Sequence, residues 1–268
     1  QPGERIGIIG GIGSGKSTLL RLLAGLYAPQ QGSVLMDKLD MRQIADDVLR
    51  QAIGYLPQDF GVYPRVNAMD MLDHMAVLKG VADKGERKAL VETLLNQTNL
   101  WNHRSHFIAG FSGGMRQRFG IAQALIGNPE LIIVDEPTAG LDPEERNRFL
   151  NLLAGISDNV VIILSTHIVD DVADLCPRMA VLAGGKVQLE GAPLDLIAQT
   201  KGRIWKKTIG RDELEAHQEQ YQVISTRLFA GRTIIHILAD SQPTGFEPVE
   251  AGLEDVYFAT LADLRRAA

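Results

Sequence analysis

The stretch Arg5-Ile6-Gly7-Ile8-Ile9-Gly10-Gly11-Ile12-Gly13-Ser14-Gly15-Lys16-Ser17 decides which fold we expect for this chain. Its first five residues predict a short buried strand. Leucines that recur between residues 18 and 26 form one broad apolar face and predict a helix. Between the strand and the helix, the residues match the spacing G-x-x-x-x-G-K-S/T in the strand–loop–helix context that this pattern requires.

The glycine-rich loop predicts a phosphate-binding site. Glycines let the backbone curl until several N–H groups face one point, where side chains would push a phosphate away. The helix that follows adds the positive end of its dipole. We expect Lys16 to contact the β- and γ-phosphates and the Ser17 hydroxyl to bind Mg²⁺. The expected nucleotide-binding residues are Gly10, Gly11, Ile12, Gly13, Ser14, Gly15, Lys16, Ser17 and Thr18.

Two acidic residues follow a second apolar strand. Leu131-Ile132-Ile133-Val134 leads directly into Asp135 and Glu136. Acids at a strand end opposite a phosphate loop can hold Mg²⁺ and orient an attacking water. Taken alone, such a pair is more often a turn or a helix cap, but beside a phosphate loop the catalytic interpretation is favoured. We therefore expect Asp135 to serve the metal through water and Glu136 to polarise the water.

The remaining apolar pattern predicts an α/β fold. The runs Leu131–Val134 and Val160–Leu164 are apolar throughout, as strands of a parallel sheet buried on both faces usually are. Residues 67–97 have helical periodicity. Residues 179–189 predict a β-hairpin that turns at Gly184-Gly185.

The character of the chain changes after about residue 200. A helix near Glu213 and a closing helix at Leu253–Leu264 are expected there, together with three strands. These strands are Trp205–Ile209, Tyr221–Leu228 and Thr233–Leu238. We expect a main domain over residues 1–200 and a small accessory α+β domain over residues 201–268.

The composition is that of an ordinary folded chain and excludes several classes. The 268 residues include 27 Lys and Arg against 33 Asp and Glu, and a net charge of −6 is unsuited to a generic nucleic-acid coat. A single cysteine, Cys176, excludes an internal disulfide and fits a reducing compartment. The longest aliphatic run, Val160–Leu164, is far shorter than the roughly 18–20 residues that span a bilayer. The chain opens at Gln1 and reaches a strand at once, so we expect a missing N-terminal segment.

Five further motifs resemble, in type and order, those of the ATP-binding cassette (ABC) ATPase family. They are a Q-loop at Gln58, the signature Phe111-Ser112-Gly113-Gly114-Met115, a Walker B strand that ends in Asp135-Glu136, a D-loop at Ala139-Gly140-Leu141-Asp142, and a switch histidine at His167. The resemblance covers roughly residues 3–200. It implies a P-loop NTPase fold with a parallel sheet and a helical subdomain, which binds ATP and Mg²⁺.

The resemblance also implies roles for these residues. In the family, the signature Ser112, Gly113 and Gly114 and the D-loop Asp142 face a nucleotide held mainly by a second subunit. His167 joins Glu136 as a catalytic residue by holding the γ-phosphate, and Gln58 joins Ser17 and Asp135 around the metal. The chemistry of the signature agrees, because a serine N-cap followed by two glycines at a helix start forms an anion-binding device.

Three departures from the family pattern are visible. The N-terminal strands are absent, and with them the aromatic residue that stacks on adenine. Gly11 and Ile12 replace a common Pro-Asn pair, which should matter little because the backbone binds the phosphates. Met115 stands where the signature usually has glutamine.

The favoured hypothesis is an ATP-binding and hydrolysing subunit of an ABC transporter. It would lie on the cytoplasmic side of the cell membrane as a peripheral protein, with a membrane permease and a second ATP-binding subunit as partners, in a homodimer or heterodimer, and without nucleic acid. Possible groove residues for a permease helix are Phe60, Tyr63, Val66 and Met69, although a role as local core residues is equally compatible. The tail over residues 245–258 resembles cassettes paired with ABC-2-type exporter permeases.

Two alternatives belong to other classes. A soluble ABC ATPase that acts on ribosomes or DNA usually has two cassettes or a long coiled-coil insert, and this chain has neither. Its tail from Arg203 onward has 8 basic against 10 acidic residues and is not basic. A P-loop kinase or GTPase is disfavoured by the signature and by His167, and no Asn-Lys-x-Asp motif is present.

Overall fold

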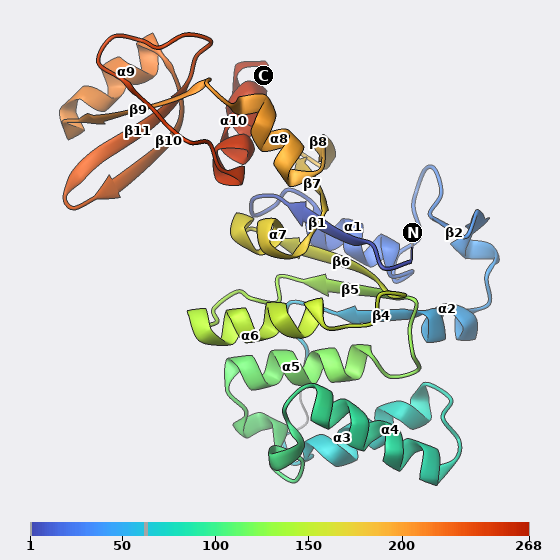
Figure 1. The fold of residues 1–268 in the computed structure, drawn as a ribbon. Helices are drawn as coiled ribbons and strands as arrows, with labels where there is room; N and C mark the ends of the chain where they lie inside the picture. Colours follow the sequence, from blue (N-terminus) through green and yellow to red (C-terminus); the bar gives the residue numbers. More distant parts are fainter. Residues whose placement is uncertain (1, 62–63, 268) are drawn as a thin grey trace. The chain divides into compact units, whose positions relative to one another are not determined.

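The computed structural model describes residues 2–61 and 64–267, which form two units (Figure 1). One unit comprises Gln1–Ile8 and Gly15–His167, and the other comprises Ile9–Ser14 and Ile168–Ala268. The expected division into domains near residue 200 stays a prediction. Tyr63, one of the possible groove residues, lies outside the described residues. None of the helices in the described ranges has the length and apolarity that crossing a bilayer requires.

The first unit is built on neighbouring strands in the order β4 (Ile53–Leu56), β5 (Leu131–Asp135), β6 (Val161–Thr166) and β1 (Arg5–Ile9). Strand β5 pairs in parallel with both β4 and β6, so that Ile132 lies opposite Gly54 and Ile162. Ile132 is fully buried. This pairing confirms the expected α/β fold with a parallel sheet. The strands are apolar throughout because both faces of such a sheet are covered.

Helix α1 (Lys16–Leu23) follows the glycine-rich loop and begins and ends earlier than expected. Gly15, in the left-handed region with φ of 102°, is its N-cap. Gly25, with φ of 71°, stops the helix before Leu26. The smaller elements before β4 are β2 (Leu35–Met36), β3 (Leu39–Asp40), the 3₁₀ helix η1 (Met41–Gln43) and α2 (Asp46–Ala52).

A helical subdomain is inserted between β4 and β5. It contains α3 (Ala68–Leu78), α4 (Lys84–Gln97), α5 (Gly113–Ala124) and the 3₁₀ helices η2 (Trp101–His103) and η3 (Ile108–Gly110). Figure 1 shows α3 and α4 side by side next to α5, and a shared apolar core joins the three helices. Phe60 and Val66 pack against this core, whereas Met69 is exposed.

The helical pattern expected over residues 67–97 is interrupted. Gly80 has φ of 89° just after α3, and the Asp83 side chain accepts the Glu86 N–H at 2.8 Å to begin α4. A left-handed glycine followed by a new N-cap ends one helix and begins another. Helix α6 (Pro143–Ala154) then follows β5 and packs against α5.

The second unit combines a hairpin, a four-stranded sheet and helices. Strands β7 (Arg178–Ala183) and β8 (Lys186–Gly191) form the expected hairpin. The sheet has the order β10-β11-β9-β12. Its strands are β9 (Ile204–Ile209), β10 (Gln222–Phe229), β11 (Arg232–Leu238) and β12 (Glu247–Pro248), and the helices are α7 (Val169–Leu175), α8 (Pro193–Thr200), η4 (Arg211–Glu213), α9 (Leu214–Gln220) and α10 (Leu253–Ala267).

One polar contact ties α10 to this sheet. His236 Nδ1 on β11 lies 2.8 Å from Asp255 Oδ1 in the first turn of α10. Burial acts to raise the pKa of Asp255, but hydrogen bonds from His236 and the Gly252 N–H outweigh burial and lower it overall. The closing helix therefore packs on the sheet with its first turn anchored by an ionised carboxylate.

Gly54→Ala tests the close packing of α5 on β4. A Cβ at Gly54 would lie 2.2 Å from the carbonyl oxygen of Ala124, a backbone atom that cannot rotate away. We expect the free energy of unfolding to fall by roughly 1–3 kcal/mol in denaturant titrations. Gly110→Ala is the matched control, because a Cβ there meets open space. Equal stabilities of the two variants would contradict the packing described.

Candidate functional site

The glycine-rich loop between β1 and α1 is built to receive an anion. Gly13 and Gly15 have φ of 76° and 102°, which side chains would disfavour. No side chain caps the N-terminus of α1. The Ser14 hydroxyl is buried and makes no hydrogen bond within the described ranges. The loop therefore offers a helix N-terminus and a hydroxyl donor that still lacks an acceptor.

Gly10 has a different reason to be glycine. A Cβ there would lie 2.5 Å from the carbonyl oxygen of Leu182 on β7. The close approach of another backbone, and not only a phosphate, therefore requires a glycine at the start of the loop. Ile12, at the other extreme, is fully exposed and nothing in its own chain covers it in the described ranges.

Three predicted site residues meet at the carboxyl ends of β5 and β6. Lys16 Nζ lies 3.1 Å from Glu136 Oε1, and both side chains are less than 10% exposed (7% and 9%). The other carboxylate oxygen, Oε2, contacts His167 Nδ1 and accepts the His167 backbone N–H at 3.3 Å. Glu136 therefore lies between a cation and an imidazole, and the His167 side chain remains 53% exposed.

The backbone of Glu136 is unusual. Its φ of 50° lies in the left-handed region that few residues other than glycine adopt. A hydrogen bond from the Glu136 N–H to the Ser165 carbonyl at 2.9 Å holds this conformation. Such backbone positions persist where the surroundings over-determine them, as they often do at functional sites.

Asp135 is the last residue of β5, directly before Glu136, and is almost fully buried. The strand register places it opposite Ser165, whose hydroxyl donates to Asp135 Oδ1 at 2.5 Å. Burial, followed by the negative charge of Asp135, raises the pKa of Tyr55 on β4 above its ordinary value. Ser165 and Tyr55 were not expected at the site, although Ser165 could have been found from its place just before Thr166-His167 at a strand end.

The expected metal ligands come from three separate elements. Asp135 and Ser17, in the first turn of α1, supply the oxygen donors that Mg²⁺ prefers. Gln58 lies in the loop after β4 and is exposed. Within the described ranges, no hydrogen bond joins Gln58 to Ser17 or Asp135.

The signature motif and the D-loop each begin a helix. Ser112 is the N-cap of α5, and its hydroxyl accepts the Met115 N–H at 3.2 Å. Gly113 is exposed, whereas Gly114 is buried. Asp142 is the N-cap of α6 and accepts the Glu145 N–H at 2.9 Å. In the part of the chain that the structure describes, no hydrogen bond or ion pair joins either cap to Lys16, Glu136 or His167.

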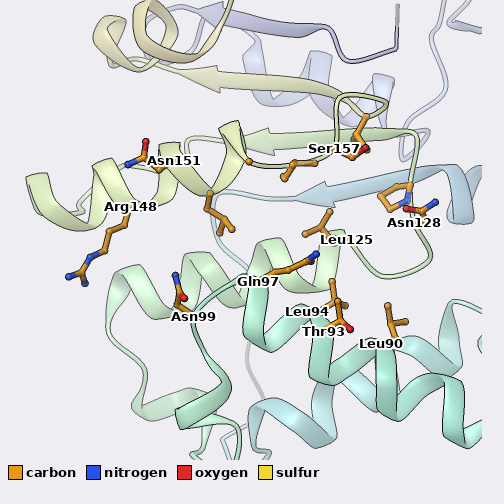
Figure 2. Close-up of a pocket in the computed structure, with 15 residues that line it drawn as sticks. Leu90, Thr93, Leu94, Gln97, Asn99, Leu125, Asn128, Arg148, Asn151 and Ser157 are labelled. Atoms are coloured by element: carbon orange, nitrogen blue, oxygen red, sulfur yellow. The ribbon is translucent and has the colours of Figure 1, made fainter.

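A separate cavity of about 640 Å³ lies between α4, α5 and α6 (Figure 2). Its lining includes Asn128 and Pro129, which precede β5, and Ser157 and Val160, which precede β6. It therefore lies at the opposite ends of these strands from Glu136 and His167. Ligands of open α/β sheets bind at the carboxyl ends of the strands, so this cavity is not the candidate site.

Comparisons with known proteins agree with this geometry. The profile of the family described as "ABC transporter" matches residues 1–139. The chain is 34% identical over 214 residues to the methionine import ATP-binding protein MetN of Corynebacterium diphtheriae, covering 78% of this chain and 63% of that protein, which is less than two thirds of its length. It is 29% identical over 273 residues to the uncharacterized ABC transporter ATP-binding protein YxlF of Bacillus subtilis, covering 95% of this chain and 89% of that protein.

A solved structure is also similar. It is the dimeric post-hydrolysis state of the ATP-binding cassette MJ0796 bound to ADP and Pi, with a TM-score of 0.64 and 30% sequence identity. The match covers 72% of this chain and 86% of that one. Sequence and fold therefore indicate the same relationship.

Lys16→Ala tests the loop as a phosphate site. The substitution removes the charge and leaves the backbone of the loop intact, so we expect ATP affinity, measured by calorimetry, to fall roughly 10–100-fold. Lys84→Ala, at the exposed start of α4, is the control and should bind as the unmodified protein does. An unchanged dissociation constant for Lys16→Ala would rule out the role of Lys16.

Proposed function

Because the chain belongs to the ABC transporter family, we propose that it is the ATP-binding and ATP-hydrolysing subunit of a transporter and acts on a separate membrane permease. The observation that carries this proposal is the joining of Lys16, Glu136 and His167 into one cluster beside the phosphate loop. The relatives reported above are named as transporter ATP-binding proteins. They give no support to the soluble alternative that acts on ribosomes or DNA.

The residues of the site fit ATP and Mg²⁺. The unpartnered Ser14 hydroxyl and the uncapped start of α1 suit phosphate oxygens. Ser17, Asp135 and Gln58 would hold the metal. When bound, Mg²⁺ neutralises charge on the phosphates.

The ion pair between Lys16 and Glu136 suggests an exchange of partners when ATP binds. Phosphate oxygens compete with the Glu136 carboxylate for Lys16 Nζ, because both are anions within reach of one ammonium group. Once Lys16 turns to the phosphates, Glu136 Oε1 is free to accept a hydrogen bond from the attacking water. His167 holds Oε2 meanwhile, and its half-exposed ring would contact the γ-phosphate.

A second ATP-binding subunit completes each site in this proposal. Ser112, Gly113, Gly114 and Asp142 would act on the nucleotide held by the partner subunit's loop. The support is that α5 begins with an anion-binding arrangement that no bond connects to its own loop within the described ranges. The related MJ0796 cassette is a dimer bound to ADP and Pi. The pair would be a homodimer or a heterodimer.

In this proposal the permease docks at the helical subdomain, and the protein lies on the cytoplasmic side of the cell membrane. Met69 on α3 is exposed and available, whereas Phe60 and Val66 mainly pack against the helical core. We further propose a permease of the ABC-2 exporter type, on the resemblance of the tail over residues 245–258. The match to YxlF runs over 95% of this chain.

Glu136→Gln tests the proposed role in hydrolysis. The amide keeps the shape of the side chain but cannot act as a base, so turnover should fall roughly 10²–10⁴-fold while ATP still binds. Glu130→Gln, at the exposed residue before β5, is the matched control and should hydrolyse ATP at the unmodified rate. Near-normal turnover by Glu136→Gln, measured as phosphate release, would refute the assignment.

The two-subunit site predicts a rate that depends on protein concentration. Specific ATPase activity should rise with concentration until dimers dominate, because each site needs residues from two chains. Light scattering in the presence of ATP should report the dimer. The dimer should be clearest for Glu136→Gln, because this variant hydrolyses the bound ATP too slowly to dissociate. Constant specific activity on dilution, with a monomer in the presence of ATP, would show that one chain suffices.

A further inference from the structure

Gly114 lies beneath the side chain of a residue on the neighbouring helix α6. A Cβ on Gly114 would lie 2.0 Å from Glu145 Oε2 and 2.6 Å from Glu145 Cδ. Gly114 does not have a positive φ, so its backbone conformation does not require glycine. Glycine is required here because the Glu145 carboxylate occupies the space that a side chain would need.

Two arginines form ion pairs with that carboxylate, and within the described residues its buried Oε2 accepts no hydrogen bond. Arg118 Nη2, on α5, lies 3.5 Å from Glu145 Oε2, and Arg148 Nη1, on α6 (labelled in Figure 2), donates to Oε1 at 2.9 Å. The side chains of Arg118 and Glu145 are only 11% and 18% exposed. A buried guanidinium without its counter-charge is costly. A movement of Glu145 away from Gly114 would therefore leave Arg118 without this counter-charge.

Glu145 also contacts the D-loop through its backbone. Its N–H donates to Asp142 Oδ1, so the same residue fixes the N-cap of α6. On the other helix, Arg118 Nε donates to the Gly114 carbonyl at 3.4 Å. The backbone of Glu145 thus holds Asp142, and its side chain holds the first turn of the signature helix.

We propose that Glu145 is a positioning residue that fixes the spacing between the signature residues Ser112–Gly114 and the D-loop Asp142. The inference rests on the proposed function, in which both motifs act on the partner's nucleotide. Glu145 itself contacts neither nucleotide nor water in this role. Its effect is on alignment, where a displacement of about 1 Å can cost roughly 100-fold in rate.

A double-mutant cycle tests the contact without any nucleotide. Gly114→Ala should lower the Tm by roughly 2–10 °C, because the new methyl group collides with a clamped carboxylate. In the background of Glu145→Ala, the same substitution should lower the Tm far less, since the colliding group is gone. Tm losses that simply add in the double variant would overturn the contact.

Glu145→Gln tests the positioning role. The amide keeps the volume but loses the charge that pairs with Arg118. At a temperature well below its Tm, we expect kcat to fall about tenfold with little change in KM or in nucleotide affinity. Glu144→Gln is the matched control, because that carboxylate also pairs with Arg148 but is 75% exposed, and it should turn over normally. Equal kcat values for the two variants would overturn the proposal.

Failure of the proposed function would look different. If the unmodified protein releases no phosphate from ATP, alone or with a permease, the function is wrong. The unfolding cycle on Gly114 and Glu145 still decides the contact in that case, because it needs no hydrolysis.

Discussion

The parallel pairing of β5 with β6 is the constraint on which the site depends. Its register sets Asp135, the last residue of β5, opposite Ser165, and Glu136 just after β5 therefore lies beside His167 just after β6. The carboxyl ends of parallel strands lie at the same edge of the sheet, so the residues that follow neighbouring strands lie close together. The left-handed backbone of Glu136, held by the Ser165 carbonyl, turns the chain at that point.

Charge follows from this geometry. Lys16 is the first residue of α1, and the carboxylate with which it pairs is Glu136. A buried lysine needs a counter-charge, and a buried carboxylate needs donors, so each satisfies the other in the absence of nucleotide. The same ammonium group is the one that the proposed reaction requires for phosphates. In the proposed reaction, ATP binding would replace this contact.

The helical subdomain is tied to the rest of its unit by equally specific contacts. The Ala124 carbonyl lies close to Gly54 of β4, and the Glu145 carboxylate of α6 lies close to Gly114 of α5. In both places, a missing side chain allows the approach of two elements. Gly114 therefore has two reasons to be glycine: its proposed contact with the partner's nucleotide and its packing against Glu145.

The sequence by itself determined the local features of this protein. The glycine-rich loop, the apolar strands, the Ser112 cap and the roles expected for Lys16 and Glu136 follow from spacing and chemistry within a few residues. The break of the helical pattern at Gly80 was missed, because apolar periodicity runs on across it. Only the tertiary structure decided that Lys16 pairs with Glu136, that Ser165 supports Asp135 and that Glu145 fills the space above Gly114. Those partners are distant in the sequence, and side-chain contacts between distant residues depend on strand register and helix packing, which no local pattern encodes.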